Sequence, residues 1–404
     1  MDAEGFERLV AAGRADPAVA RLAARLGRGV TFERDGRAHV VVPGPAADVV
    51  IQAPAQVWDA MLAPLPAPGH QSFGAAQRAE PRLRVVAEPL AWAQALPMLE
   101  RLIEAMRAAA HPVRDDDAEL NLDRLDCRHR RIRWPDGRDA WVYEEAAGDP
   151  NQPVMLCLHT AGADARQWHG VMTDAALGRR WRMVAFDMPS HGRSPPPPGW
   201  RGEPWQLTAA RYLDVITAWM DASGLQRVAV TGCSMGAAIG LAFLARRAPR
   251  AHGAILLETP WRSPGRRNDF LDHPAVHGGR FGAAWVQALL SPHSPAAHRR
   301  RATWIYAQSA PGVYEGDLAF YSDEFDAAHY TGDIDTRRTP LWLMTGDYDY
   351  SATPADTRKV AAAVPGAQFM QLDGFGHFPM TEDPQRLLAH FRPAADALRA
   401  TIAP

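Results

Sequence analysis

The chain has 404 residues, of which 47% are hydrophobic and 22% are charged, and its formal net charge at pH 7 is -2. These values are ordinary for a globular protein with a large core, and they exclude a general electrostatic attraction to nucleic acid or to an anionic membrane surface. The three cysteines show no disulfide or metal-binding spacing. The acidic start lacks a signal peptide's basic and apolar regions, and no apolar run reaches the roughly 18 residues of a membrane span. We expect a cytoplasmic, bacterial-type protein of two or three structural units.

The first 112 residues predict a small α+β domain. The pair Asp35-Gly36 stands between two alternating apolar segments, which is a strong signal for a β-hairpin. A long helix is indicated where Leu96, Leu99, Ile103 and Met106 recur at helical spacing. The expected strands are 30–34, 37–42 and 48–51, and the expected helices are 54–62 and 90–106. A charged run, Arg114 to Glu119, then predicts a linker over 113–127.

This N-terminal pattern resembles the sterol-carrier-protein-2 fold. The features that carry the resemblance are the hairpin with Asp-Gly, the strand that ends at Ile51 and its following helix, and the segment Leu83 to Val86 before a second amphipathic helix. The resemblance implies that an apolar tunnel binds a lipid. The alternative is an unrelated α+β domain that serves as a scaffold or as a contact between copies in a homo-oligomer.

From residue 128 onward, apolar strands alternate with helices, which predicts a mostly parallel sheet covered on both faces. The expected strands are 130–134, 139–143, 154–158, 182–186, 228–231, 254–257, 341–344 and 368–372, the first two forming an antiparallel pair at the edge. The alternation fails over 260–339, which is too long for a plain loop and rich in aromatic residues, including Tyr314, Phe320 and Tyr321. We therefore expect a core over 128–259 and 340–404, with a helical cap over 260–339.

A candidate nucleophile lies at Gly232-Cys233-Ser234-Met235-Gly236, between a buried strand and a helix that extends to about Arg247. Small residues on both sides of Ser234 allow a sharp strand-to-helix turn, a nucleophile elbow that lifts the serine hydroxyl above the sheet. The same spacing also occurs in purely structural turns. A catalytic interpretation therefore requires a base and an acid elsewhere in the chain.

A serine hydroxyl is a poor nucleophile until a histidine takes its proton, and the histidine in turn needs a carboxylate to orient it. The strand 341–344 runs into Gly346-Asp347-Tyr348-Asp349, and we choose Asp349 as the acid, with Asp347 as the alternative. The strand 368–372 runs into a glycine-rich turn that delivers His377, our candidate base. His159 and His191 are interpreted as residues that brace loops.

The chain order Ser234, Asp349, His377 resembles that of the α/β-hydrolases, and the resemblance extends from about residue 128 to the end. His159-Thr160-Ala161-Gly162 resembles the oxyanion loop of that family, and 186–194 resembles its loop after the next central strand. The resemblance implies an oxyanion hole made by the backbone N–H groups of Met235 and Ala161. Thr160 stands where the family usually has glycine, so its hydroxyl either adds a contact or reshapes the loop.

The expected activity is hydrolysis of an ester or thioester of a hydrophobic small molecule through an acyl-enzyme, without a cofactor. The alternatives are cleavage of a carbon–carbon bond in a diketone-type substrate, a cofactor-independent perhydrolase activity, and a catalytically idle lipid-binding protein. His273, His277, His293 and His298 lack the spacing of metal ligands, so no metal is expected. The candidate residues for the substrate pocket are Thr160, Trp168, Trp261, Trp304, Tyr306 and Phe378.

Overall fold

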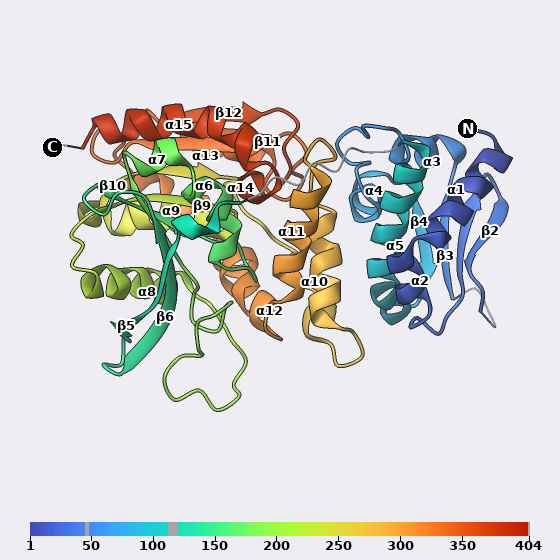
Figure 1. Cartoon of the computed structure of the whole chain (residues 1–404), viewed down its shortest axis with the longest axis horizontal. Helices are drawn as coiled ribbons and strands as arrows, with labels where there is room; N and C mark the ends of the chain where they lie inside the picture. Colours follow the sequence, from blue (N-terminus) through green and yellow to red (C-terminus); the bar gives the residue numbers. More distant parts are fainter. Residues whose placement is uncertain (45–47, 112–119, 403–404) are drawn as a thin grey trace. The chain divides into compact units, whose positions relative to one another are not determined.

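The computed structural model describes residues 1–44, 48–111 and 120–402. The chain forms two compact units, drawn with their element labels in Figure 1. The first contains the described residues of 1–117 together with 269–307, and the second contains those of 118–268 together with 308–404. Of the predicted linker, 113–127, residues 113–119 lie outside the described residues, and its last two residues begin the strand β5 (Asp126–Arg133).

The first unit is built on a four-stranded sheet in the order β2-β1-β3-β4. Its central strands pair in parallel, and each outer strand is antiparallel to its neighbour. Asp35 and Gly36 have φ angles of 51° and 78°, so the predicted Asp-Gly hairpin is confirmed. The strands are β1 (Val30–Arg34), β2 (Arg37–Val42), β3 (Val49–Ala53) and β4 (Arg84–Ala87).

Seven α-helices of the described residues belong to this first unit. Phe6, Phe32 and Trp58 form its aromatic core, in which the ring of Trp58 lies 5.2 Å from Phe6 and 4.6 Å from Phe32. Two helices come from the segment predicted as the cap, and α10 packs against α5, where Trp92 contacts Phe281. The predicted cap, 260–339, is therefore divided between the two units. The helices are α1 (Ala3–Ala15), α2 (Pro17–Ala23), α3 (Ala55–Met61), α4 (Phe73–Ala79), α5 (Pro89–Ala110), α10 (Gly278–Gln287) and α11 (Ala296–Ala307).

The second unit contains an eight-stranded sheet in the order β12-β11-β10-β9-β7-β8-β6-β5. The strands from β12 to β8 are parallel, whereas β6 and β5 are antiparallel at one edge, as predicted. All six residues of β9 are buried, which agrees with the unbroken apolar pattern of a central parallel strand. The strands are β5 (Asp126–Arg133), β6 (Asp139–Ala147), β7 (Val154–Leu158), β8 (Arg182–Phe186), β9 (Val228–Cys233), β10 (Ala251–Leu257), β11 (Leu341–Gly346) and β12 (Gln368–Leu372).

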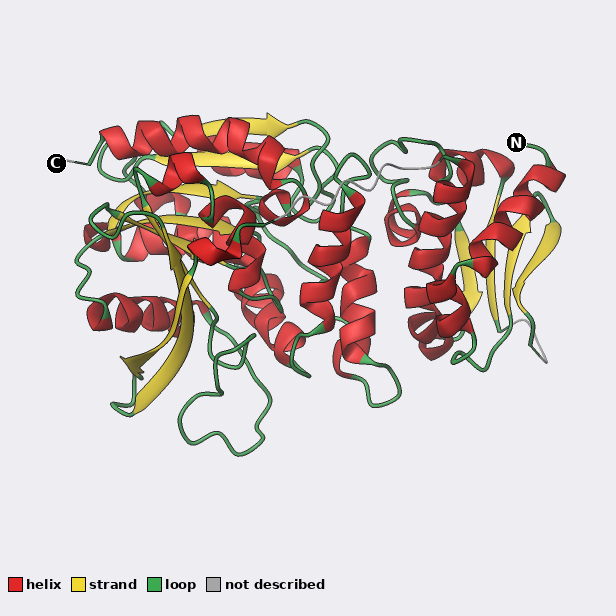
Figure 2. Cartoon of the chain, viewed as in Figure 1, coloured by secondary structure: helices red, strands yellow, loops and turns green. Residues whose placement is uncertain are grey.

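Helices cover both faces of this sheet, as the ribbon coloured by secondary structure shows (Figure 2). In the same unit, α12 continues directly into a π-helix, Ala319–Glu324, a rare form that is often found at functional sites. Across residues 1–44, 48–111 and 120–402, no helix combines the length and apolar character that a membrane crossing requires. The helices are α6 (His169–Met172), α7 (Ala175–Gly178), α8 (Ala209–Ala222), α9 (Met235–Arg246), α12 (Val313–Leu318), α13 (Pro354–Ala363), α14 (Pro379–Glu382) and α15 (Pro384–Ala400).

Candidate active site

Ser234 lies at the sharp turn between β9 and α9, with φ 56° and ψ -115°. The residues two positions before and after it, Gly232 and Gly236, have no side chains, and the space around them is too small for one. A Cβ atom at Gly236 would lie 2.4 Å from the carbonyl oxygen of Leu158, and one at Gly232 would lie 2.2 Å from that of Gly236. The two glycines therefore allow α9 to approach the sheet closely, and the turn places the serine hydroxyl at the carboxyl end of β9.

The structure brings Ser234, His377 and Asp349 together in one hydrogen-bonded chain. His377 Nε2 lies 2.8 Å from Ser234 Oγ, and His377 Nδ1 lies 2.6 Å from Asp349 Oδ2. All three residues are buried. Their side chains start from the carboxyl ends of β9, β11 and β12, which meet at the same edge of a parallel sheet.

The environment of Asp349 favours its charged form. Its Oδ1 accepts hydrogen bonds from the N–H groups of Ser351 (2.6 Å) and Ala352 (3.2 Å). Burial opposes ionisation, but His377 and these contacts hold the pKa of Asp349 below its ordinary value. The alternative acid, Asp347, instead accepts the N–H of Gly374 at 2.7 Å and so supports the turn that precedes His377.

Glu258, which the sequence reasoning did not select, is a second carboxyl group in this cluster. It follows β10 with a φ of 51°, is fully buried, and accepts the N–H of Gly346 at 2.9 Å. One ligand atom each from Glu258, Asp349 and His377 lie within 4.8 Å of one another. Burial and the neighbouring charge of Asp349 raise the pKa of Glu258 well above its ordinary value, so Glu258 keeps its proton beside the Asp349 carboxylate.

Met235 and Ala161, the predicted oxyanion donors, lie at the start of α9 and in the loop after β7. Met235 is the first residue of α9, so its N–H has no acceptor within the helix. Ala161 is buried in the loop that follows β7. The hydroxyl of Thr160 lies 3.1 Å from Gln167 Oε1, which also accepts the Thr160 N–H at 3.0 Å, so this residue helps to shape the loop.

Asp317 of α12 anchors the same loop from a second direction. Its carboxylate, fully buried, accepts the N–H of Gly162 (2.8 Å), His191 Nε2 (2.7 Å) and Trp205 Nε1 (2.8 Å). Burial alone would lower the pKa of His191, but Asp317 raises it above the ordinary value. His159 accepts the N–H of Met188 at 3.2 Å through Nε2. These contacts agree with the interpretation of both histidines as loop-bracing residues.

The candidate pocket residues fall in different places. Phe378 packs edge-on against the ring of His377, with 4.8 Å between centroids. Trp168 is a core residue whose indole N–H donates to the carbonyl oxygen of Leu158 at 3.1 Å. Trp261 lies 4.1 Å from the Lys359 ammonium. Trp304 and Tyr306 lie on α11 of the first unit, whereas the Ser234 site belongs to the second.

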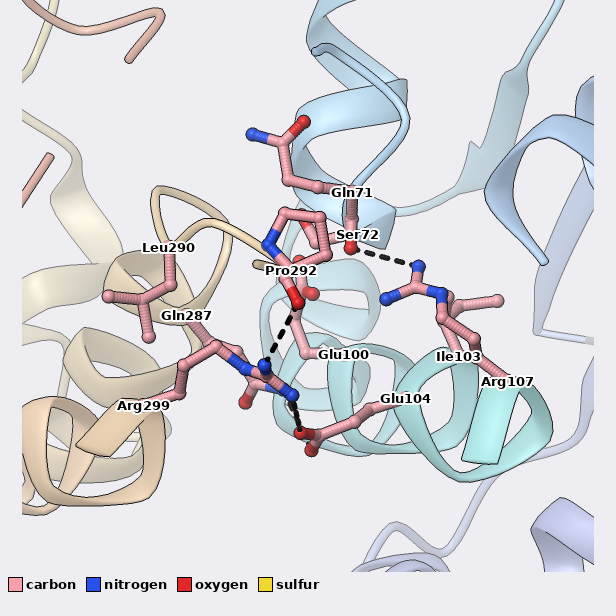
Figure 3. Close-up of a pocket in the computed structure, with 10 residues that line it drawn as sticks. All are labelled: Gln71, Ser72, Glu100, Ile103, Glu104, Arg107, Gln287, Leu290, Pro292 and Arg299. Carbon is pink, nitrogen blue, oxygen red and sulfur yellow. Dashed lines mark hydrogen bonds and ion pairs between the residues drawn. The ribbon is translucent and has the colours of Figure 1, made fainter. Parts of the chain in front are cut away.

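The first unit contains a polar cavity of about 20 Å³, shown in Figure 3. Arg299 bonds to Glu104 (3.2 Å) at its wall, and Arg107 donates to the carbonyl oxygen of Gln71 (2.9 Å). Glu100 is buried there and accepts the N–H of Gly74 at 2.6 Å. A cavity of this size holds about one water molecule, which makes it a poor candidate for a substrate site.

Residues 153–384 match the family model described as the alpha/beta hydrolase fold, which covers more than half of the chain. The chain belongs to this family and is an enzyme, an α/β-hydrolase.

Among similar proteins is RutD of Klebsiella pneumoniae (strain 342), whose name describes it, provisionally, as a carbamate hydrolase. It is 25% identical over 235 residues, which span 56% of this chain and 85% of RutD. A thermophilic esterase from Thermogutta terrifontis superposes with a TM-score of 0.58 at 19% identity, covering 68% of this chain and 99% of the esterase. The enol-lactonase of Burkholderia xenovorans LB400 has a TM-score of 0.55 at 22% identity, covering 64% and 96%. The two structures show the shared fold.

Proposed function

We propose that the enzyme is a serine hydrolase that cleaves an ester or thioester of a hydrophobic small molecule through an acyl-enzyme. The observation that carries this proposal is the continuous chain of hydrogen bonds from Ser234 through His377 to Asp349, with distances of 2.8 Å and 2.6 Å. Such a chain supplies a nucleophile, a base and an orienting acid. A strained serine at a strand-to-helix turn supports the same assignment.

In the proposed first half-reaction, His377 Nε2 takes the proton of the Ser234 hydroxyl while the oxygen attacks the substrate carbonyl. The oxyanion that forms is stabilised by the N–H groups of Met235 and Ala161, and each such donor contributes about 3 kcal/mol to lowering the barrier. Asp349 stabilises the imidazolium that His377 becomes. His377 then returns the proton to the leaving alcohol or thiol as the tetrahedral intermediate collapses to the acyl-enzyme.

In the second half-reaction, His377 takes a proton from water, and the resulting hydroxide equivalent attacks the acyl carbonyl. The same oxyanion donors act again, and His377 returns the proton to Ser234 as the acid leaves. The similarity to RutD suggests that a carbamate should also be tested, because its carbonyl would be attacked in the same way. The aromatic ring of Phe378 beside His377 supports an apolar substrate.

The test is turnover of p-nitrophenyl esters from acetyl to long-chain acyl, together with a p-nitrophenyl carbamate, by the wild type and by Ser234→Ala. The proposal predicts ester turnover that falls by roughly 10⁴-fold or more in the variant. The control is Ser223→Ala, which removes a serine just after α8, outside the proposed site. Equal rates for Ser234→Ala and the wild type, or no turnover of any ester, would contradict the proposal.

A further inference from the structure

Arg266 is a buried cation close to the loop that carries Asp349. Arg266 is only 7% exposed to solvent. One Nη atom donates to the carbonyl oxygens of Tyr350 (3.3 Å) and Ser351 (3.0 Å), whereas Nε is buried and has no partner. Among the residues that the structure describes, no carboxylate lies within ion-pairing distance of Arg266. A buried guanidinium is normally paired with an anion, because removing a charge from water without compensation is costly.

The neighbouring Arg267 shows the usual arrangement. Its guanidinium lies 3.1 Å from Asp323 and 3.1 Å from Glu315, and its side chain is 41% exposed. The more exposed arginine therefore has two acidic partners, while the buried one has only backbone carbonyl groups. If both arginines had only a structural role, the buried one would be the one with acidic partners, because desolvation makes an unpaired buried charge costly. The reverse arrangement indicates that the missing anion comes from outside the chain.

Two buried hydroxyl groups accompany this arginine. The hydroxyl oxygens of Tyr321 and Ser263 are both buried and have no hydrogen-bond partner among the described residues. Tyr321 lies on the π-helix Ala319–Glu324. Its hydroxyl is near those of Ser234 and Ser263, and the charge of Arg266 acts on it, although none of these contacts has the geometry of a hydrogen bond. Burial raises the pKa of Tyr321 to about 12, so the phenol stays protonated and can donate.

We propose that Arg266, Tyr321 and Ser263 form an anion subsite beside Ser234, so that the preferred ester, otherwise apolar, carries one carboxylate separated from the attacked carbonyl by a short chain. Arg266 donates to the carbonyl oxygen of Ser351, and the N–H of Ser351 donates to Asp349 Oδ1, so the proposed subsite adjoins the loop that carries Asp349 of the Ser234 cluster. The single negative charge of a carboxylate balances the single positive charge of the guanidinium, whereas a phosphate monoester carries a charge of about -1.5 to -2 at pH 7. The two oxygens of a carboxylate can accept hydrogen bonds from the unpartnered Nε of Arg266 and from the hydroxyl groups of Tyr321 and Ser263. The inference rests on the proposed function.

The test compares two p-nitrophenyl esters of similar shape: the monoester of glutaric acid, which is anionic, and the 5-methylhexanoate, which is neutral. We expect the wild type to favour the anionic ester in kcat/KM by roughly tenfold or more, the effect of one charge-assisted pair in a buried site. In Arg266→Gln, the ratio of the two kcat/KM values should fall by roughly tenfold. Arg267→Gln should leave the ratio unchanged. A wild type that favours the neutral ester, or an unchanged ratio in Arg266→Gln, would overturn the proposal.

A binding measurement separates this inference from the proposed function. Free glutarate should raise the melting temperature of the wild type and of Ser234→Ala, relative to chloride at equal ionic strength, and should not raise that of Arg266→Gln. If no ester is hydrolysed, the proposed function fails, but glutarate binding still decides the subsite. If Arg266→Gln does not fold, Ser263→Ala and Tyr321→Phe replace it, and each should weaken glutarate binding. No effect of glutarate on the wild type would overturn the subsite.

Discussion

Asp317 accepts a 2.8 Å hydrogen bond from the backbone N–H of Gly162, next to Ala161 in the loop that follows β7. This contact joins α12 to the loop that would supply one of the two oxyanion donors. The carboxylate is fully buried and also accepts hydrogen bonds from His191 and Trp205, so the loop is held by an acceptor with three donors. The position of the proposed oxyanion hole therefore depends on a residue far away in the sequence.

We predict that Asp317→Asn lowers kcat for ester hydrolysis by roughly tenfold or more, because an amide cannot accept three donors and the loop shifts away from the developing oxyanion. KM should change less than kcat, since the loss concerns the transition state. Steady-state kinetics on one ester checks this. Asp323→Asn, which alters an exposed partner of Arg267, is the control. An Asp317→Asn enzyme with normal kcat would rule out the positioning role.

Two substitutions of Glu258, one by glutamine and one by alanine, test its role, and each serves as the control for the other. Its carboxyl group stays protonated beside Asp349 and accepts the N–H of Gly346, so a neutral glutamine can replace it in both respects, whereas alanine cannot. Glu258→Gln should retain most of the wild-type activity, and Glu258→Ala should lose at least about tenfold in kcat. Both variants have a side chain at the same positive φ, so backbone strain is matched. If both variants lost activity equally, Glu258 would act through a negative charge instead.

Glu100 in the first unit predicts a pH dependence of stability. Burial raises its pKa from the ordinary value of 4.5 to about 8. Between these values the folded state holds a proton that the unfolded state releases, so the free energy of unfolding should fall as the pH rises from about 4.5 to 8, by up to about 1.4 kcal/mol per pH unit. Urea unfolding at pH 5 and pH 8 measures this loss. In Glu100→Gln the loss of unfolding free energy should be smaller. The same dependence of unfolding free energy on pH in both proteins would contradict the raised pKa of Glu100.

Gly236→Ala should damage the proposed site more than Gly240→Ala on the same helix. The added methyl group at Gly236 would meet the backbone oxygen of Leu158 at 2.4 Å, whereas the one at Gly240 meets the side chain of Leu256 at 2.6 Å, which can rotate. Overpacking of this kind costs about 1–3 kcal/mol, and at Gly236 it also displaces the start of α9. We expect a larger loss of kcat in Gly236→Ala than in Gly240→Ala. Urea unfolding of both variants measures how much stability each has lost. Equal activities would contradict the steric account.

The strand pattern was predictable because the strands of the second unit are buried and apolar, and the hairpin at Asp35-Gly36 because its turn requires positive φ. Ser234, Asp349 and His377 could be chosen because each follows a predicted strand, and their order along the chain resembles that of the α/β-hydrolases. The residues around this cluster could not be predicted, because the contacts of Glu258, Asp317 and Arg266 are set by tertiary packing. For the same reason, the pairing of 269–307 with the first unit left no local signal. The resemblance of the first unit to the sterol-carrier-protein-2 fold stays a prediction.

The central claim is that Ser234 is the nucleophile, and covalent labelling tests it most directly. The protein would be treated with an alkyl fluorophosphonate, and the modified peptide identified by mass spectrometry. We predict one adduct per chain, on Ser234, that forms far more slowly in His377→Ala and at the normal rate in His390→Ala. Ester turnover by a protein that carries no adduct on Ser234, or an adduct confined to another residue, would contradict the account.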